Sequence, residues 1–85
     1  MARLRDGTVV WREVDGEIVA LDVSTSTYIA VNPTGAFLWP SLVEGASQEE
    51  LAQRLVQSYD VDLRRAAQDV AVFLAPLRER GLLEE

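Results

Sequence analysis

The 85-residue sequence contains no cysteine and no histidine. Disulfides, thiol nucleophiles, Ser-His and Cys-His dyads and the commonest zinc ligand sets each require one of these residues. The sequence also lacks an apolar run of the ~20 residues that a membrane span requires. The first six residues, Met-Ala-Arg-Leu-Arg-Asp, are not followed by the apolar stretch of a secretory signal. These absences exclude most enzyme chemistry and predict a cytoplasmic protein that does not span a membrane.

Lysine is absent too, so all eight basic residues are arginines, and fourteen acidic residues outnumber them to give a net charge of −6. This balance would on the whole repel a phosphate backbone, and we expect no nucleic-acid partner. A hydrophobic content of 48% is typical of a globular protein. The length and the absence of repeats or linkers predict one domain over residues 1–85.

Three β-strands are predicted in the first third of the chain, over residues 8–14, 17–23 and 27–31. The first two are joined by Asp15-Gly16, the dipeptide that best fits a two-residue type I′ hairpin turn. Neither alternating set of the second strand is strongly polar, so we expect that strand to be central and covered on much of both faces. The third strand then lies at the edge of an antiparallel meander.

Three helices are predicted to follow, over residues 33–45, 48–58 and 63–80. Each begins after a residue whose side chain can cap it, namely Asn32, Ser47 and Asp62. Pro40 lies inside the first helix and is expected to kink or shorten it. Only residues 81–83 could add a few extended residues after the last helix. The order of elements predicts an α+β fold, a three-stranded antiparallel sheet followed by three helices, similar to a winged helix-turn-helix.

No catalytic or metal site is predicted from the carboxylates. Asp60 and Asp62 are close in sequence, but no third ligand accompanies them, and helix capping explains Asp62. No cofactor is expected. A winged helix that binds DNA should carry basic residues on its second or third helix, whereas the segment 48–58 has only Arg54 against two glutamates.

The last helix has a wider apolar surface than one packing face requires. At ~100° per residue, five residues form a core stripe: Leu63, Ala67, Val70, Leu74 and Leu77. Ala66, Asp69 and Phe73 lie along its flank. Two interpretations follow: the helix is buried on two sides by its own domain, or the flank and the third strand form a groove that receives an extended peptide as an added strand. An edge strand that stays open is otherwise an aggregation hazard.

Several short motifs in a fixed order suggest a family. They are Asp15-Gly16 and Leu21-Asp22, residues 28–32 followed by Gly35 and Trp39, Leu55 and Tyr59, Asp69-Val70, Phe73-Leu74, Leu77 and Gly81-Leu82-Leu83. With this order and spacing the sequence resembles the PqqD-like precursor-peptide (RiPP) recognition elements, small leader-peptide-binding proteins of ribosomal peptide biosynthesis. It looks most like the free-standing version of lasso-peptide pathways.

The resemblance implies a non-catalytic, winged-helix-like domain that binds the leader of a precursor peptide against the third strand and the third helix. Its implied partners are the precursor leader peptide, a leader peptidase of the cysteine-protease class and an ATP-dependent cyclase. A peptide chaperone for a radical SAM enzyme, a winged-helix transcription regulator and an unrelated protein-interaction domain are the alternatives. Carried onto this chain, the leader-binding residues are Thr27, Tyr28, Ile29, Ala30, Val31, Pro33, Arg65, Ala66, Asp69, Val70 and Phe73. The leader would pair with the backbone of residues 27–31. Tyr28, Ala30 and Pro33 would form one wall of the groove, Ala66, Asp69, Val70 and Phe73 the other, and Arg65 and Asp69 would lie at the rim.

Overall fold

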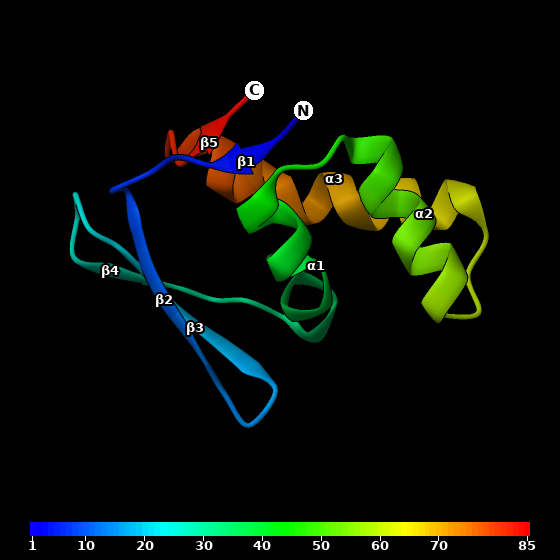
Figure 1. Cartoon of the computed structure of the whole chain (residues 1–85), viewed down its shortest axis with the longest axis horizontal. Coiled ribbons are helices and arrows are strands. Elements are labelled where there is room, and N and C mark those ends of the chain that lie inside the picture. Colours follow the sequence, from blue (N-terminus) through cyan, green and yellow to red (C-terminus); the bar gives the residue numbers. More distant parts are fainter.

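The computed structural model describes residues 1–85 as two small antiparallel sheets and three helices (Figure 1). The strands are β1 (Arg3–Leu4), β2 (Val9–Val14), β3 (Glu17–Asp22), β4 (Thr27–Ile29) and β5 (Leu83–Glu84). The helices are α1 (Pro33–Glu44), α2 (Gln48–Ser58) and α3 (Leu63–Glu79). The predicted α+β class, with a three-stranded antiparallel sheet and three helices, is confirmed.

The β2–β3 hairpin forms where the sequence predicts it. Asp15 and Gly16 have φ angles of 53° and 80°, the left-handed values that both central residues of a type I′ turn need. Strand order in this sheet is β2-β3-β4, so the meander and the edge position of β4 are confirmed. The regular part of β4 ends at Ile29, two residues earlier than predicted.

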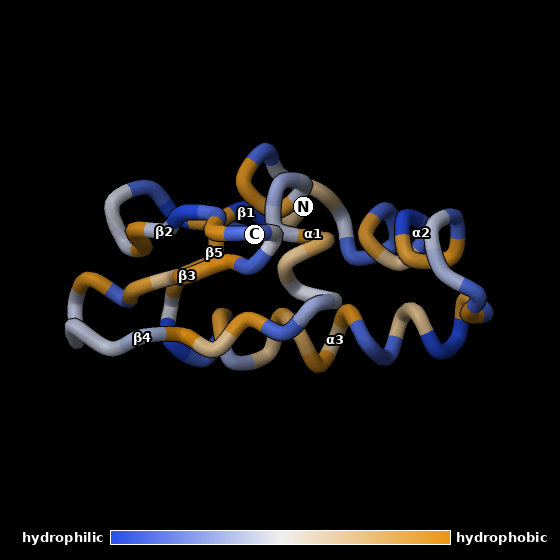
Figure 2. The backbone as a smooth tube through the Cα atoms, turned by 90° about the horizontal axis from the view of Figure 1, so that it is seen from below, coloured by the Kyte–Doolittle hydropathy of each residue, from blue (hydrophilic) through white to orange (hydrophobic).

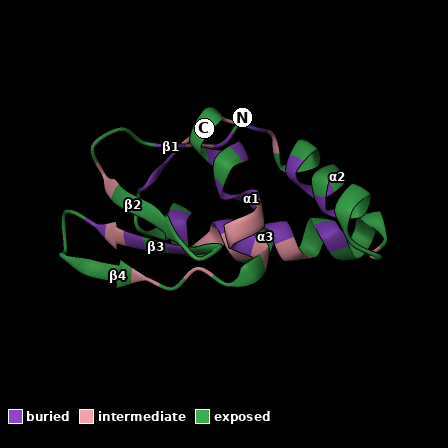
Figure 3. Cartoon of the chain, turned by 60° about the horizontal axis from the view of Figure 1, so that its bottom comes forward, coloured by how far each residue is buried: buried purple, intermediate pink, exposed green.

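The sheet is covered on one face only. Ile18, Ala20 and Asp22 of β3 are buried, whereas Val19, which points to the other face, is 42% exposed. Most of β2 and β4 is also exposed (Figure 3). The expectation that β3 is covered on much of both faces is therefore wrong, because no element packs on the outer face.

All three predicted helix caps are present. The Asn32 side chain accepts a hydrogen bond from the Gly35 N–H (2.8 Å), and Asp62 caps α3 in the same way through the Arg65 N–H (2.8 Å). Ser47 and Glu50 form the reciprocal capping box. Exposed Pro40 does not shorten α1, which continues to the predicted stop at Gly45. None of the helices has the length and apolar content that crossing a membrane requires.

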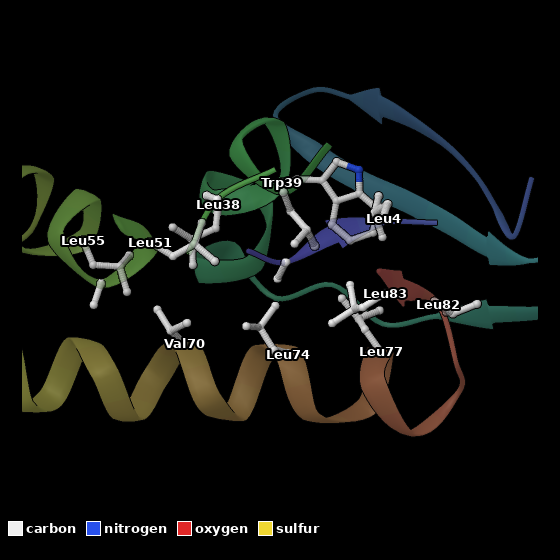
Figure 4. Packing of buried hydrophobic residues seen from close by; sticks show 14 of the residues in the cluster. Leu4, Leu38, Trp39, Leu51, Leu55, Val70, Leu74, Leu77, Leu82 and Leu83 are labelled. Atoms are coloured by element: carbon white, nitrogen blue, oxygen red, sulfur yellow. The ribbon is translucent and has the colours of Figure 1, made fainter. Parts of the chain in front are cut away.

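The core lies between α3 and the layer formed by α1, α2 and the β1–β5 pair (Figure 4). Leu38 and Trp39 of α1 are fully buried, and Val70, Leu74 and Leu77 point toward this layer from α3. The predicted core stripe of α3 is wrong at its N-terminal end: Leu63 is 52% exposed, and Ala67 is exposed as well.

Ala66 takes their place in the core, with no exposed surface. The buried stripe runs Ala66, Val70, Leu74 and Leu77, a spacing of 4, 4 and 3 residues that follows one side of the helix. Its start is set by α2, which packs alongside α3. The helical periodicity used in the sequence analysis was right, but over the first turn of α3 it assigned the wrong side of the helix to the core.

The two ends of the chain form a second sheet that the sequence did not predict as paired strands. β1 pairs with β5, with Arg3 opposite Glu84 and Leu4 opposite Leu83. Arg3 and Glu84 also form an ion pair of 2.6 Å, and the hydrogen bond from Arg3 lowers the pKa of the Glu84 carboxyl. Each strand has two residues, which is too short for a periodic pattern to indicate.

Candidate functional site

The free side of β4 is one of the two open edges of the three-stranded sheet, and the other belongs to β2. β4 pairs with β3 on one side and with nothing on the other. Ala30 and Val31 continue the strand direction but belong to no strand or helix, and outside the regular ladders no backbone hydrogen bond involves either residue. Residues 27–31 therefore present an open strand edge.

A hollow of about 390 Å³ lies beside this edge. We call it the edge groove, and its lining residues are Ala30, Val31, Asn32, Val72, Phe73 and Pro76. One wall is the extended segment after β4, and the other is the C-terminal half of α3, which runs alongside (Figure 2). The sequence argument that placed a groove between the third strand and the third helix agrees with this geometry.

The strand residues are divided between the two faces of the sheet. Tyr28 lies opposite Leu21 and is 73% exposed; with Val10 it lines a shallow hollow on the outer face. Ile29 points the other way and packs against the core. Tyr28 was expected on a groove wall together with Ala30. Ala30 lines the edge groove and Tyr28 does not. Strict alternation would keep residues 28 and 30 on one face, but Ala30 lies beyond the end of β4, where the regular strand has stopped.

Pro33 is separated from the edge groove. It lines a different hollow, together with Gly16 and Ile18 at the hairpin end of the sheet. Val31 lines both hollows and so lies between them.

On α3, two of the predicted wall residues lie inside the core. Ala66 is 0% and Val70 is 1% exposed, so neither side chain is accessible to a peptide in the groove, and their assignment to the wall is corrected. Val72, which is 63% exposed, and Pro76 form the wall together with Phe73.

Val72, Pro76 and Asn32 were missed by the sequence argument. The signal for the helix residues was present: positions 69, 72, 73 and 76 have the spacing of one helix face, adjacent to the stripe that is buried. A core stripe that begins at Ala66 rather than Leu63 would have placed these positions on the face beside it. The sequence argument assigned Asn32 only as a helix cap, whereas in the structure it both caps α1 and lines the edge groove.

A charged pair lies on α3 toward its N-terminus. Arg65 Nε donates to Asp69 Oδ1 (3.2 Å), and the two side chains are 67% and 33% exposed. An exposed pair of this kind contributes little to stability. Asp69 is one turn before Phe73, so the pair lies on α3 on the N-terminal side of the edge groove.

Asp22 and Arg80 link the three-stranded sheet to the C-cap of α3. Arg80 Nη1 donates to Asp22 Oδ2 (3.1 Å), and no other side-chain hydrogen bond joins the three-stranded sheet to α3 or its C-cap. Asp22 is 1% exposed and also accepts hydrogen bonds from the hydroxyl and the N–H of Ser24. The Ser24 hydroxyl and Arg80 hold the pKa of this carboxyl below its ordinary value.

The edge groove offers apolar contact and backbone hydrogen bonds and carries no acid, base or nucleophile among its lining residues. No group of three His, Cys, Asp or Glu side chains anywhere in the chain is arranged to hold a metal ion. What this arrangement can do is hold an extended chain: an open edge pairs with a strand, and a small apolar groove beside it accepts alternate side chains.

Comparison with known proteins agrees with this geometry. The family model described as coenzyme PQQ synthesis protein D (PqqD) matches residues 17–83. The chain belongs to the PqqD family. Among curated proteins no sequence relative of this family member is found.

Two solved structures resemble this PqqD-family chain over nearly its whole length. One is TbiB1 in complex with the TbiA(beta) leader peptide, with 33% identity, a TM-score of 0.85, and 96% of this chain and 94% of that chain covered. The other is lasso peptide synthetase B1 complexed with the leader peptide, with 30% identity, a TM-score of 0.82, and 99% and 98% covered.

Proposed function

We propose that this chain binds the leader segment of a ribosomally made precursor peptide and catalyses no reaction itself. The observation that carries the proposal is the open edge of residues 27–31 beside the edge groove. Two similar proteins, with 33% and 30% sequence identity to this chain, have solved structures in complex with leader peptides. That likeness supports a leader as the extended chain that fits here.

In the proposed complex the leader adds to β4 as a fourth strand. Its backbone pairs with residues 27–31, where each hydrogen bond contributes a net ~0.5–1.5 kcal/mol. Alternate leader side chains then point toward α3, and one of them enters the edge groove against Val31 and Phe73. The side chains between them point to the outer face beside Tyr28, whose 73% exposed ring is free to pack on them.

Arg65 and Asp69 are proposed to bind polar or charged leader groups at the rim. A leader that occupies the groove and continues along α3 toward its N-terminus passes these residues. Their mutual ion pair is exposed, so exchanging it for contacts with the leader costs little.

We further propose that the bound peptide is delivered to separate enzymes of a lasso-type pathway, a leader peptidase of the cysteine-protease class and an ATP-dependent cyclase. The lasso peptide synthetase B1 likeness supports this pathway. The PqqD family match supports a second candidate, a peptide chaperone for a radical SAM enzyme. The two candidates share the leader site and differ in the enzymes that act on the peptide.

Titration followed by NMR tests the leader site. The TbiA(beta) leader, or the leader of a precursor gene found beside the gene for this chain, is added to the ¹⁵N-labelled protein, and a scrambled peptide of the same composition is the control. We expect shifts concentrated in residues 27–31 and 69–76 with the leader alone. Unchanged amides in both segments, with the protein folded, would contradict the proposal.

A further inference from the structure

Gly35 lies in the first turn of α1, against the ring of Phe73. A Cβ atom at Gly35 would lie 2.8 Å from Phe73 Cε1, 2.9 Å from Phe73 Cδ1 and 3.1 Å from Val31 Cγ1. The backbone there is helical and does not need glycine, and glycine disfavours a helix relative to alanine. The close approach of Phe73 is the feature of the structure that accounts for a residue without a side chain.

Phe73 can yield in one direction only. Its ring packs on Trp39, with the ring centroids 6.3 Å apart, and Trp39 is fully buried. Protein interiors are close-packed, so the ring has no room to move inward. Its other side is half-buried and lines the edge groove. A ring displaced from Gly35 would therefore enter the groove.

We propose that Gly35 is a specificity-determining residue of the leader site: because it has no side chain, the Phe73 ring lies back against α1, and this sets how large a leader side chain the edge groove accepts. The inference rests on the proposed leader binding. None of the six lining residues is charged, so the side chain that enters is apolar, aliphatic or aromatic. Gly35 acts through Phe73 and Val31 and touches the leader through neither charge nor hydrogen bond.

The first test is Gly35→Ala, measured by fluorescence anisotropy with the labelled leader of the neighbouring precursor gene and, as a second probe, the TbiA(beta) leader. We expect a folded protein, because the substitution favours the helix and keeps the Asn32 cap. We expect leader affinity to fall about tenfold, since a ring pushed into the groove overfills it. Circular dichroism and the melting temperature report the fold separately.

The second test is rescue by Phe73→Leu. Leucine has no Cε1, the ring atom nearest the added Cβ, and its Cδ1 is not held in a rigid ring and can turn away. The Gly35→Ala/Phe73→Leu double variant should therefore recover most of the lost affinity. The double-mutant cycle should show strong coupling between the two positions. A smaller neighbour would also relieve a purely structural clash, so the rescue supports the proposal only where circular dichroism and the melting temperature show that the Gly35→Ala single variant is folded like the wild type.

The third test reads groove size directly, and its Phe73→Leu arm does not require Gly35→Ala to fold. An alanine scan of the leader identifies the side chain that enters the groove, and that residue is then replaced by smaller and larger apolar residues. Phe73→Leu should shift the preference toward larger side chains, and Gly35→Ala toward smaller ones.

The outcomes separate the two proposals. If the wild-type protein binds neither leader, the proposed function fails. If the wild-type protein binds but Gly35→Ala binds equally well, or the size preference is unchanged in Phe73→Leu, the role of Gly35 is wrong and leader binding stands.

Discussion

Val72→Ala should weaken leader binding about fivefold and leave stability nearly unchanged. The substitution removes both methyl groups, each worth ~0.8 kcal/mol when fully buried. Val72 is 63% exposed in the free chain. A leader that covers it would therefore bury about that fraction of the two methyl groups, which is worth about 1 kcal/mol of binding free energy. Because 1.4 kcal/mol is about tenfold in Kd, 1 kcal/mol is about fivefold.

The effect on folding is small because two terms oppose each other. The share of the methyl groups already buried is lost, at a cost of about 0.6 kcal/mol. Alanine is the better helix former by a similar amount, ~0.6 kcal/mol. The free energy of unfolding, measured by urea denaturation, should therefore match the wild type within about 0.5 kcal/mol.

Val56→Ala is the matched control. Val56 is an exposed valine on α2 and does not line the edge groove, so the same change there should leave leader affinity unaltered. Both variants are compared with the wild type by isothermal titration calorimetry. Equal Kd values for all three proteins would refute the α3 wall of the leader site, even if the leader still binds elsewhere.

Three further predictions concern the fold. Leu74→Ala, two residues from Val72 but fully buried, should cost ~2–5 kcal/mol of unfolding free energy in urea; a cost like that of Val72→Ala would contradict the assignment of helix faces. Gly16→Ala, at φ +80°, should lower stability by ~1–2 kcal/mol, while an unchanged melting temperature would argue against the type I′ turn. Asp22→Asn should be less stable than the wild type at neutral pH. The pKa of Asp22 lies below its ordinary value of 3.8, so its stabilisation is present above pH 3.8 and is lost as the pH falls through the lowered pKa. The gap between the two proteins should narrow on acidification, and a gap independent of pH would exclude the carboxylate as its source.

Local chemistry predicted much of this fold from the sequence. Asp15-Gly16, Ser47 with Glu50, and Asp62 each act on backbone groups within a few residues, so their effect can be read from neighbouring letters alone. The edge position of β4 followed from order, because no later segment had the pattern of a strand that could cover it.

What the sequence could not supply depends on contacts between distant segments. The rotation of α3 is set by α2 and α1, which bury Ala66 and leave Leu63 exposed. The face on which Tyr28 lies is set by its register with Leu21, and a one-residue change in register reverses every side chain of a strand. Ala66 and Tyr28 were misplaced because these two tertiary choices decide their direction, whereas Pro33 lies at the start of α1 and lines a different hollow.

An open edge is a hazard in a free protein, and the surroundings of residues 27–31 limit it. The edge is short, and Val72 and Pro76 of α3 lie across the groove from it. A second copy would have to bring a whole sheet into that space, against a charge of −6 on each chain. A single extended peptide needs only the width of one strand. We therefore expect the helix wall of the proposed leader site to admit a single strand at this edge more readily than the sheet of a second copy.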